Sequence, residues 1–416
     1  MPSLAQKEIV LSFEDARRCV EEHAVRLKDT CSQYEEVALL ASAGRILAVD
    51  ISADRDYPPF PRATRDGYAV RAVDLSQFPA RLRQTAQIKA GADEPDDFRI
   101  STGECAEIMT GAPVPAGADA VVMVEHTSQE GECITFMRQA MPGENIVPAG
   151  SEAHSGQQVL TQWTRIGYPQ IAVAAAVGKE HVRVYQRPRV AILSTGDEIV
   201  EISATPGPSQ IRNSNSYSLA AQIAAAGGEP VQLPIAPDEP ARLRELVSQG
   251  LSCDLLLLSG GVSMGKFDLV EEVLREFGAE FFFTGVLIQP GKPVVFGQVT
   301  RPKPTYFVGL PGNPISTMVT FELFGHPLIA GLSGVVPPPL RFTPARLLAD
   351  IITKTGLTRF LPARLSGGQH SPEVALVAWQ GSGDIFAVSR ANCFLVVPPN
   401  KEHITAGEMV SVWERL

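Results

Sequence analysis

Apolar residues between positions 188 and 334 come in short continuous runs that alternate with segments of helical periodicity. The clearest run, Leu255–Leu258, leads through the glycine-rich segment Ser259–Gly265 into a helical pattern that begins at Leu269. Continuous apolar runs of this length are typical of buried strands. Because strands that alternate with helices form parallel sheets covered on both faces, we expect a doubly wound α/β domain here.

The pattern differs on both sides of this region. A capping signal at Ser12 and Asp15 predicts a helix through about Leu27. Residues 51–184 read as short alternating strands separated by Gly, Pro and Asp, which favours a β-rich region with few helices. The proline-rich stretch 335–339 is typical of a stiff linker, and the remainder to residue 416 again predicts short strands.

Polar loops follow three of the predicted buried strands, at 194–198, 259–265 and 311–316. The carboxyl ends of parallel strands meet at one edge of a sheet, where such folds bind their ligands. Glycine-rich loops that open a helix offer backbone N–H groups to anions. Asp268 stands at such a helix start, where it could cap the helix or hold a cation. We therefore expect a site for a phosphate or another oxyanion at this edge.

Composition restricts the function further. The chain has 416 residues and a formal net charge of −10, which opposes non-specific binding to nucleic acid and to anionic membranes. The six cysteines and seven histidines show neither zinc-ligand spacing nor a disulfide framework. Neither a Walker loop nor a dinucleotide fingerprint is present. With no signal peptide and no apolar run of membrane-spanning length, we expect a cytoplasmic protein.

Each of the polar segments also has a purely structural interpretation. Turns, chain reversals or an acidic helix start would explain 66–68, 110–115, 195–198, 259–265, 290–293 and 311–314 taken singly. Their joint occurrence makes a common functional role the stronger interpretation.

Taken together, the segments resemble the molybdopterin molybdenumtransferase family, whose eukaryotic relatives include the gephyrin E domain. The matching residues, in the family's order, are 66–70, 109–113, 194–198, 259–263, 290–293 and 310–314. The resemblance implies four domains, and the composition changes agree with it. They are a discontinuous linker domain (1–51 and 150–186), an inserted β-rich domain (52–149), a MogA-like α/β molybdopterin-binding domain (187–335) and a C-terminal β-barrel (336–416).

The resemblance also implies the reaction, in which adenylylated molybdopterin and molybdate give molybdenum cofactor and AMP in the presence of a divalent cation such as Mg²⁺. The catalytic candidates are Asp66, Glu198, Asp268 and Lys292, with Glu198 and Asp268 as metal ligands. The substrate-binding candidates are Thr110, Thr195, Gly196, Asp197, Asp238, Gly260, Gly261, Ser263, Pro311, Asn313 and Pro314.

The chain departs from the family pattern in its cationic residues. Arg65 stands where the family often has methionine, with Arg62 nearby, whereas Gly285 and Gln289 replace lysines that some members carry. The segment Val147–Glu152 replaces an arginine-rich stretch. We hypothesise that Arg62 or Arg65 supplies the missing positive charge.

The resemblance further implies an elongated homodimer, in which Asp66 and Asp268 of one site belong to different chains. Expected partners are the protein that adenylylates the pterin and chaperones of molybdoenzymes, with no nucleic acid and no membrane. Two alternatives stay open, namely a paralogue that inserts tungsten and a non-catalytic scaffold of the gephyrin E type.

Overall fold

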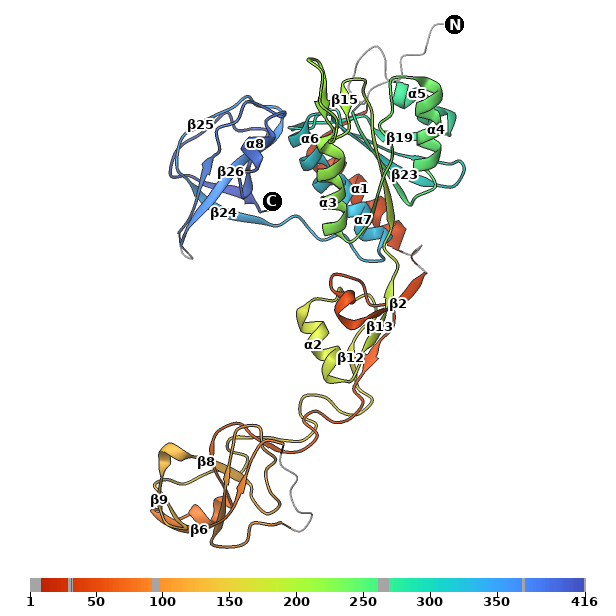
Figure 1. The fold of residues 1–416 in the computed structure, drawn as a ribbon. Coiled ribbons are helices and arrows are strands. Elements are labelled where there is room, and N and C mark those ends of the chain that lie inside the picture. Colours follow the sequence, from red (N-terminus) through yellow and green to blue (C-terminus); the bar gives the residue numbers. More distant parts are fainter. Residues whose placement is uncertain are drawn as a thin grey trace. The chain divides into compact units, whose positions relative to one another are not determined.

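The computed structural model describes residues 9–28, 31, 33–91, 98–260, 269–368 and 371–414. The chain forms two compact units (Figure 1). The first contains Met1–Glu35, Gly44–Ile46 and Val184–Leu416, and the second contains Glu36–Ala43 and Leu47–Arg183. Two of the crossings between units lie within β2 (Tyr34–Ala38) and β13 (His181–Tyr185). The finer domain boundaries stay predictions.

The first unit contains the expected α/β sheet. Its six strands are, in spatial order, β17 (Glu229–Gln232), β14 (Arg189–Ser194), β18 (Leu255–Ser259), β23 (Thr305–Leu310), β22 (Val295–Val299) and β19 (Glu280–Phe283). The first four are parallel, whereas β22 and β19 are antiparallel to their neighbours. The expectation of a wholly parallel sheet was therefore wrong at this edge, because the connections between these strands are too short to hold a crossover helix.

Helices cover both faces of this sheet, which confirms the doubly wound class (Figure 1). One buried cluster draws on α1 (Phe13–Lys28), α3 (Ser214–Ala226), α6 (Pro314–Thr320) and α7 (His326–Leu332). The opposite cluster draws on α4 (Pro240–Gly250) and α5 (Leu269–Glu276). The hydroxyl of Ser12 accepts from the N–H of Asp15 at 3.1 Å, so the first helix starts where its cap predicts.

A π-helical turn, η4 (Phe321–Gly325), joins α6 to α7. Within the described ranges, the stretch Pro314–Leu332 is the one helix long and apolar enough to cross a membrane, and 78% of its apolar window is buried inside the fold. Polar residues such as Glu322 interrupt this stretch, so the apolar pattern alone does not reveal it as one long helix. We assign it to the core of the first unit.

A closed five-stranded barrel ends the first unit, as expected. Its strands are β26 (Thr358–Gly368), β27 (Ser371–Leu376), β24 (Phe342–Leu347), β30 (Met409–Trp413) and β28 (Cys393–Val397), and β28 pairs with β26 to close the ring. Strand β21 (Ile288–Gln289) pairs with β26 and so joins the barrel to the α/β part. The short helix α8 (Ile385–Val388) follows β27.

The smaller strands of the first unit are paired locally. They are β1 (Val10–Leu11) with β20 (Gly285–Val286), β15 (Ile199–Val200) with β16 (Ile211–Arg212), and β25 (Ile351–Ile352) with β29 (His403–Ile404).

The second unit is β-rich, as expected. Its main sheet has the order β8 (Ala120–Met123), β5 (Gly67–Val70), β7 (Glu104–Ile108), β6 (Ala80–Ile88), β10 (Cys133–Phe136) and β9 (Thr127–Glu130). Two short pairs accompany it, β4 (Arg62–Ala63) with β11 (Ile146–Val147) and β3 (Ile51–Ser52) with β12 (Gln158–Leu160). The sequence analysis missed α2 (Tyr168–Ala176), a nine-residue helix with Pro in its first turn.

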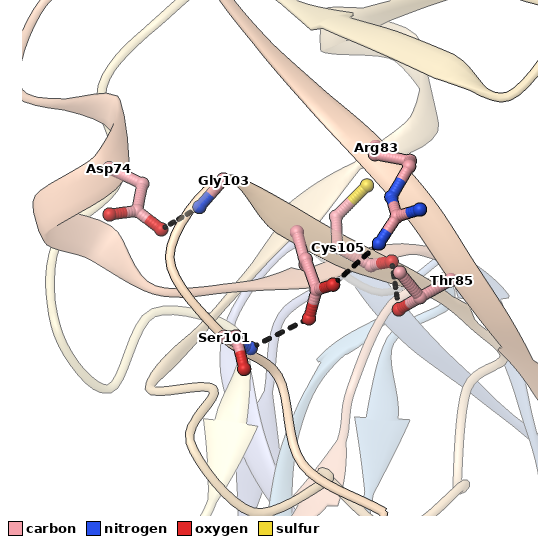
Figure 2. Close-up of polar contacts among 7 residues, drawn as sticks. Asp74, Arg83, Thr85, Ser101, Gly103 and Cys105 are labelled. Atoms are coloured by element: carbon pink, nitrogen blue, oxygen red, sulfur yellow. Dashed lines mark hydrogen bonds and ion pairs between the residues drawn. The ribbon is translucent and has the colours of Figure 1, made fainter.

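Figure 2 shows how the turn before β7 is fixed. Glu104 accepts from the N–H of Ser101 at 3.0 Å and pairs with Arg83 at 2.9 Å, while Asp74 accepts from the N–H of Gly103 at 3.1 Å. The bond from Ser101 is the main reason that the pKa of Glu104 lies below its ordinary value. Burial raises the pKa of the neighbouring Cys105 thiol to about 12, so it is an inert part of the core.

Candidate functional site

A cavity of about 370 Å³ lies at the carboxyl edge of β14, β18 and β23. All three polar loops identified in the sequence reach it. It is lined by Ser194, Thr195, Glu198, Ile199, Ile211, Arg212, Asn213, Ser214, Asn215, Ser259, Gly260, Pro293, Pro311, Gly312, Asn313 and Pro314.

The loop after β14 turns sharply at Gly196. Thr195 donates its N–H to the carbonyl of Ser259 at 3.1 Å, so this loop begins in register with the neighbouring strand. Gly196 has φ +134°, and a Cβ there would lie 2.4 Å from Glu198 Oε2. Glycine adopts such a positive φ readily, whereas residues with a Cβ rarely do. The turn thereby places Glu198 in the cavity wall.

The start of α3 ties the loops together. Asn213 caps the helix, accepting from the N–H of Ser216 at 3.1 Å and from the hydroxyl of Ser194 at 3.2 Å. Asn215 donates to the hydroxyl of Ser259 at 2.9 Å and to the carbonyl of Gly312 at 2.7 Å. One asparagine thus links the loop after β18 to the loop after β23, which makes this end of the cavity rigid.

Two acceptors in the cavity lining have no partner among the described residues. They are Thr195 Oγ1 and Asn215 Oδ1, both buried atoms, and Thr195 as a whole is only 5% exposed. Leaving a buried polar atom unpaired costs about 1–3 kcal/mol. A bound ligand, a water molecule or a cation that satisfies these atoms would recover that cost.

Carboxylates gather beside the same loop. The N–H of Asp238 donates to Asp197 Oδ1 at 3.1 Å. Burial, and then the negative charges of Asp197 and Glu198, raise the pKa of Asp238 above its ordinary value. Over the residues that the structure describes, no group of three or more His, Cys, Asp or Glu side chains converges on one point. The local negative charge nevertheless suits the binding of a hard cation.

A second cavity, of about 360 Å³, adjoins the first and shares Pro293, Pro311 and Asn313 with it. Its other lining residues come from the Pro-Gly-Lys-Pro turn, from α6 and from the barrel, namely Ile288, Gln289, Pro290, Gly291, Ser316, Leu357, Trp379, Gly381 and Ser382. The side chain of Lys292, in this turn, is exposed. Gln289 Oε1 accepts from Nε of the buried Arg359 at 2.9 Å. The positively charged guanidinium of this barrel residue therefore contacts the glutamine side chain.

The second unit holds Asp66 and Thr110, which contact each other. Thr110 donates its N–H to Asp66 Oδ1 at 2.7 Å, and this bond, followed by that of the Thr110 hydroxyl, holds the pKa of Asp66 below its ordinary value. Gly67 is required by close packing, because a Cβ there would lie 1.9 Å from the carbonyl oxygen of Val122. The alternative of a simple hairpin turn at 66–67 is therefore wrong, since Gly67 opens β5 inside the sheet.

The two arginines near this segment differ. Arg62 pairs with Glu152 at 2.7 Å, and Glu152 belongs to the segment that departs from the family pattern. Arg62 is therefore largely neutralised, whereas the side chain of Arg65 is exposed. Of the two, Arg65 stays the candidate for attracting an anion.

The structure brings together Thr195, Glu198, Gly260, Pro311, Asn313 and Pro314 in one cavity lining, with Gly196 and Asp197 in the same loop. Gly261, Ser263 and Asp268 lie outside the described residues. Asn213 and Asn215 were not among the predicted site residues, although the run of asparagine and serine at 213–216 is a strong signal for a helix start.

Known proteins match the chain over most of its length. Residues 11–178 match the family model of the MoeA N-terminal region (domains I and II), residues 191–331 that of a probable molybdopterin-binding domain, and residues 344–414 that of the MoeA C-terminal region (domain IV). The chain is 35% identical over 405 residues to a molybdopterin molybdenumtransferase of Nostoc sp., covering 92% of this chain and 89% of that protein. A molybdopterin molybdenumtransferase of Synechocystis sp. is 33% identical over 409 residues, covering 96% and 98%. A crystal structure of the molybdopterin biosynthesis MoeA protein from Pyrococcus horikoshii superposes with a TM-score of 0.77 at 27% identity, covering 98% and 100%.

Proposed function

Because the chain belongs to the molybdopterin molybdenumtransferase family, we propose that the cavity at the carboxyl edge of β14, β18 and β23 binds adenylylated molybdopterin. The enzyme inserts molybdate into this substrate, giving molybdenum cofactor and AMP. The observation that carries the assignment of the site is the convergence of three strand-end loops on one cavity that contains two buried polar atoms without a partner in the part of the chain that the structure describes. This cavity lies within the segment that matches the molybdopterin-binding family model.

The residues of the cavity divide into two groups by their chemistry. Thr195, Asn215 and the start of α3 bind the substrate, because they offer fixed polar groups at the sheet edge. Glu198, in the cavity lining, and Asp268, which lies outside the described residues, would hold a divalent cation such as Mg²⁺, which would neutralise the phosphoanhydride as it is cleaved. The shared negative charge of Asp197, Glu198 and Asp238 supports this placement of the cation.

Asp66 and Thr110 complete the site in this proposal, contributed by the second unit of a partner chain in a homodimer. Their mutual hydrogen bond keeps the Asp66 carboxylate ionised and oriented. The protein would work in the cytoplasm, receiving its substrate from the pterin-adenylylating protein and passing product to molybdoenzyme chaperones.

The test is a turnover assay on the purified chain. Adenylylated molybdopterin is supplied with Mg²⁺, and AMP release is followed with no oxyanion, with molybdate or with tungstate. Release that requires molybdate supports the assignment, and release with tungstate alone favours the tungsten paralogue. A protein that binds adenylylated molybdopterin but releases no AMP with either oxyanion would instead be a scaffold.

A further inference from the structure

In the barrel, the loop between β27 and α8 contacts the start of α6 through Ser382. The carbonyl of Ser382 accepts from the N–H of Ile315 at 3.0 Å. The hydroxyl of Ser382 accepts from Nδ2 of Asn313 at 2.9 Å. Both contacts join the barrel to the loop that lines both cavities.

The orientation of Asn313 is unusual for its position. It is the N-cap residue of α6, where an asparagine side chain ordinarily accepts from the first N–H groups of the helix. Here its side chain makes no cap hydrogen bond and turns to Ser382 instead. The barrel therefore decides where this amide points.

The consequence concerns hydrogen-bond direction. The bond from Nδ2 to Ser382 fixes which way the amide points, so Oδ1 of Asn313 takes a set position, able to accept, in a residue that lines both cavities. In the first cavity, Thr195 Oγ1 and Asn215 Oδ1 also lack a partner among the described residues; the amide oxygen accepts, whereas the hydroxyl can accept or donate. All three oxygens can therefore accept from the N–H and O–H donors of a heterocycle or sugar.

We propose that Ser382 is a positioning residue of the substrate site, which fixes the amide of Asn313 so that its oxygen accepts from a donor on the substrate. The barrel loop that also contributes Trp379 and Gly381 is then one wall of the site. This inference rests on the proposed function.

Three variants separate positioning from structural support. Ser382→Ala removes the hydroxyl but keeps the carbonyl that receives Ile315, and Ser382→Thr keeps the hydroxyl. The matched control is Ser389→Ala, an exposed barrel serine whose hydroxyl donates to the carbonyl of Phe386 at 2.8 Å, away from both cavity linings. Melting temperatures of all variants check that folding is intact.

Loss of one neutral hydrogen bond predicts a decrease of about 3- to 10-fold in kcat/KM for Ser382→Ala, carried mainly by KM. Ser382→Thr should recover most of it, and Ser389→Ala should match wild type. On an Asn313→Ala background, Ser382→Ala should cause no further loss, because its effect passes through Asn313. Affinity for AMP, measured separately, shows which half of the substrate faces Asn313. If the affinity for AMP falls while KM rises, the adenosine half of the substrate faces Asn313. If KM rises and the affinity for AMP is unchanged, the pterin half faces Asn313.

Two results would overturn the inference. One is a kcat/KM of Ser382→Ala equal to that of Ser389→Ala. The other is an equal loss in the presence and absence of the Asn313 side chain. Failure of the proposed function is distinguishable, since the wild-type chain would then release no AMP at all.

Discussion

At the scale of single residues, the cavity lining combines polar side chains that follow strand ends, such as Thr195 and Asn313, with the carboxylate of Glu198. Thr195, Glu198 and Asn313 could be selected because each follows a strongly apolar strand in a short polar loop. Asn215 could not be selected, since its role depends on contacts with two loops that are distant in sequence. Tertiary packing, and not local pattern, determines that kind of residue.

At Asp268, the substitution Asp268→Asn keeps the shape of the side chain and removes its charge. We expect AMP release to fall by at least about tenfold, the effect of losing about 1.4 kcal/mol of electrostatic stabilisation. Initial rates at saturating Mg²⁺ provide the measurement, with the exposed Glu272→Gln as control. Unchanged turnover would leave Asp268 as a structural cap.

At Asp238, the raised pKa predicts a dependence of stability on pH. An acid whose pKa is higher in the folded protein destabilises the fold once it ionises, so stability is lost as the pH rises through the folded pKa. Asp238→Asn should raise the melting temperature at pH 7, and the gain should shrink as the pH falls toward the ordinary value of 3.8. Exposed Glu201→Gln serves as control. A gain that is constant with pH would contradict this interpretation.

At Arg65, the exposed cation should attract an anionic substrate to an acidic protein. Arg65→Ala should weaken substrate binding at low ionic strength, and the difference should shrink as salt screens the charge. The double variant Arg62→Ala/Glu152→Ala is the matched control, because it removes an ion pair and leaves the net charge unchanged. Equal affinities for Arg65→Ala and wild type at every ionic strength would rule out this role.

At the scale of elements, the strongly patterned segments were predicted best. The helix α1 begins after its serine cap, and the apolar run of β18 is fully buried at the centre of the sheet. The antiparallel strands β22 and β19 were not anticipated, because periodicity does not report strand direction. The helix α2 was missed, since a lone helix among strand patterns gives a weak signal.

The packing between strands can be tested at Gly67, where β5 pairs with β8. A Cβ would lie 1.9 Å from the carbonyl oxygen of Val122, so Gly67→Ala should destabilise the second unit by about 1–3 kcal/mol or more. Gly131→Ala, with φ +63° but no atom within 4 Å of its Cβ, should cost only about 1 kcal/mol. Thermal unfolding compares the two, and an equal loss would contradict the role of the close contact with Val122.

At the scale of the whole molecule, the two units raise the question of which chains build one site. The proposed homodimer places Asp66 of one chain with Asp268 of the other. Mixing the inactive variants Asp66→Ala and Asp268→Asn should then restore about a quarter of wild-type activity. About half of the randomly exchanged dimers are mixed, and one of the two sites in each mixed dimer carries neither defect.

The control for this mixing experiment is mass analysis that verifies subunit exchange, together with proof that each parent variant is inactive. If both residues belonged to the same chain's site, every site would keep a defect. Mixing would then restore nothing, and the shared site would be excluded while the enzymatic assignment stood.

The most direct test of the central claim is a single-turnover measurement of AMP release from adenylylated molybdopterin, comparing wild type with Thr195→Val. The substitution keeps the shape of a buried side chain and removes the unpaired Oγ1 atom of the cavity. We predict that wild type releases AMP only when molybdate is added, and that Thr195→Val, with a melting temperature no lower than that of wild type, releases it at least about tenfold more slowly. Molybdate-dependent release at the wild-type rate by Thr195→Val would contradict the assignment of the substrate to this cavity.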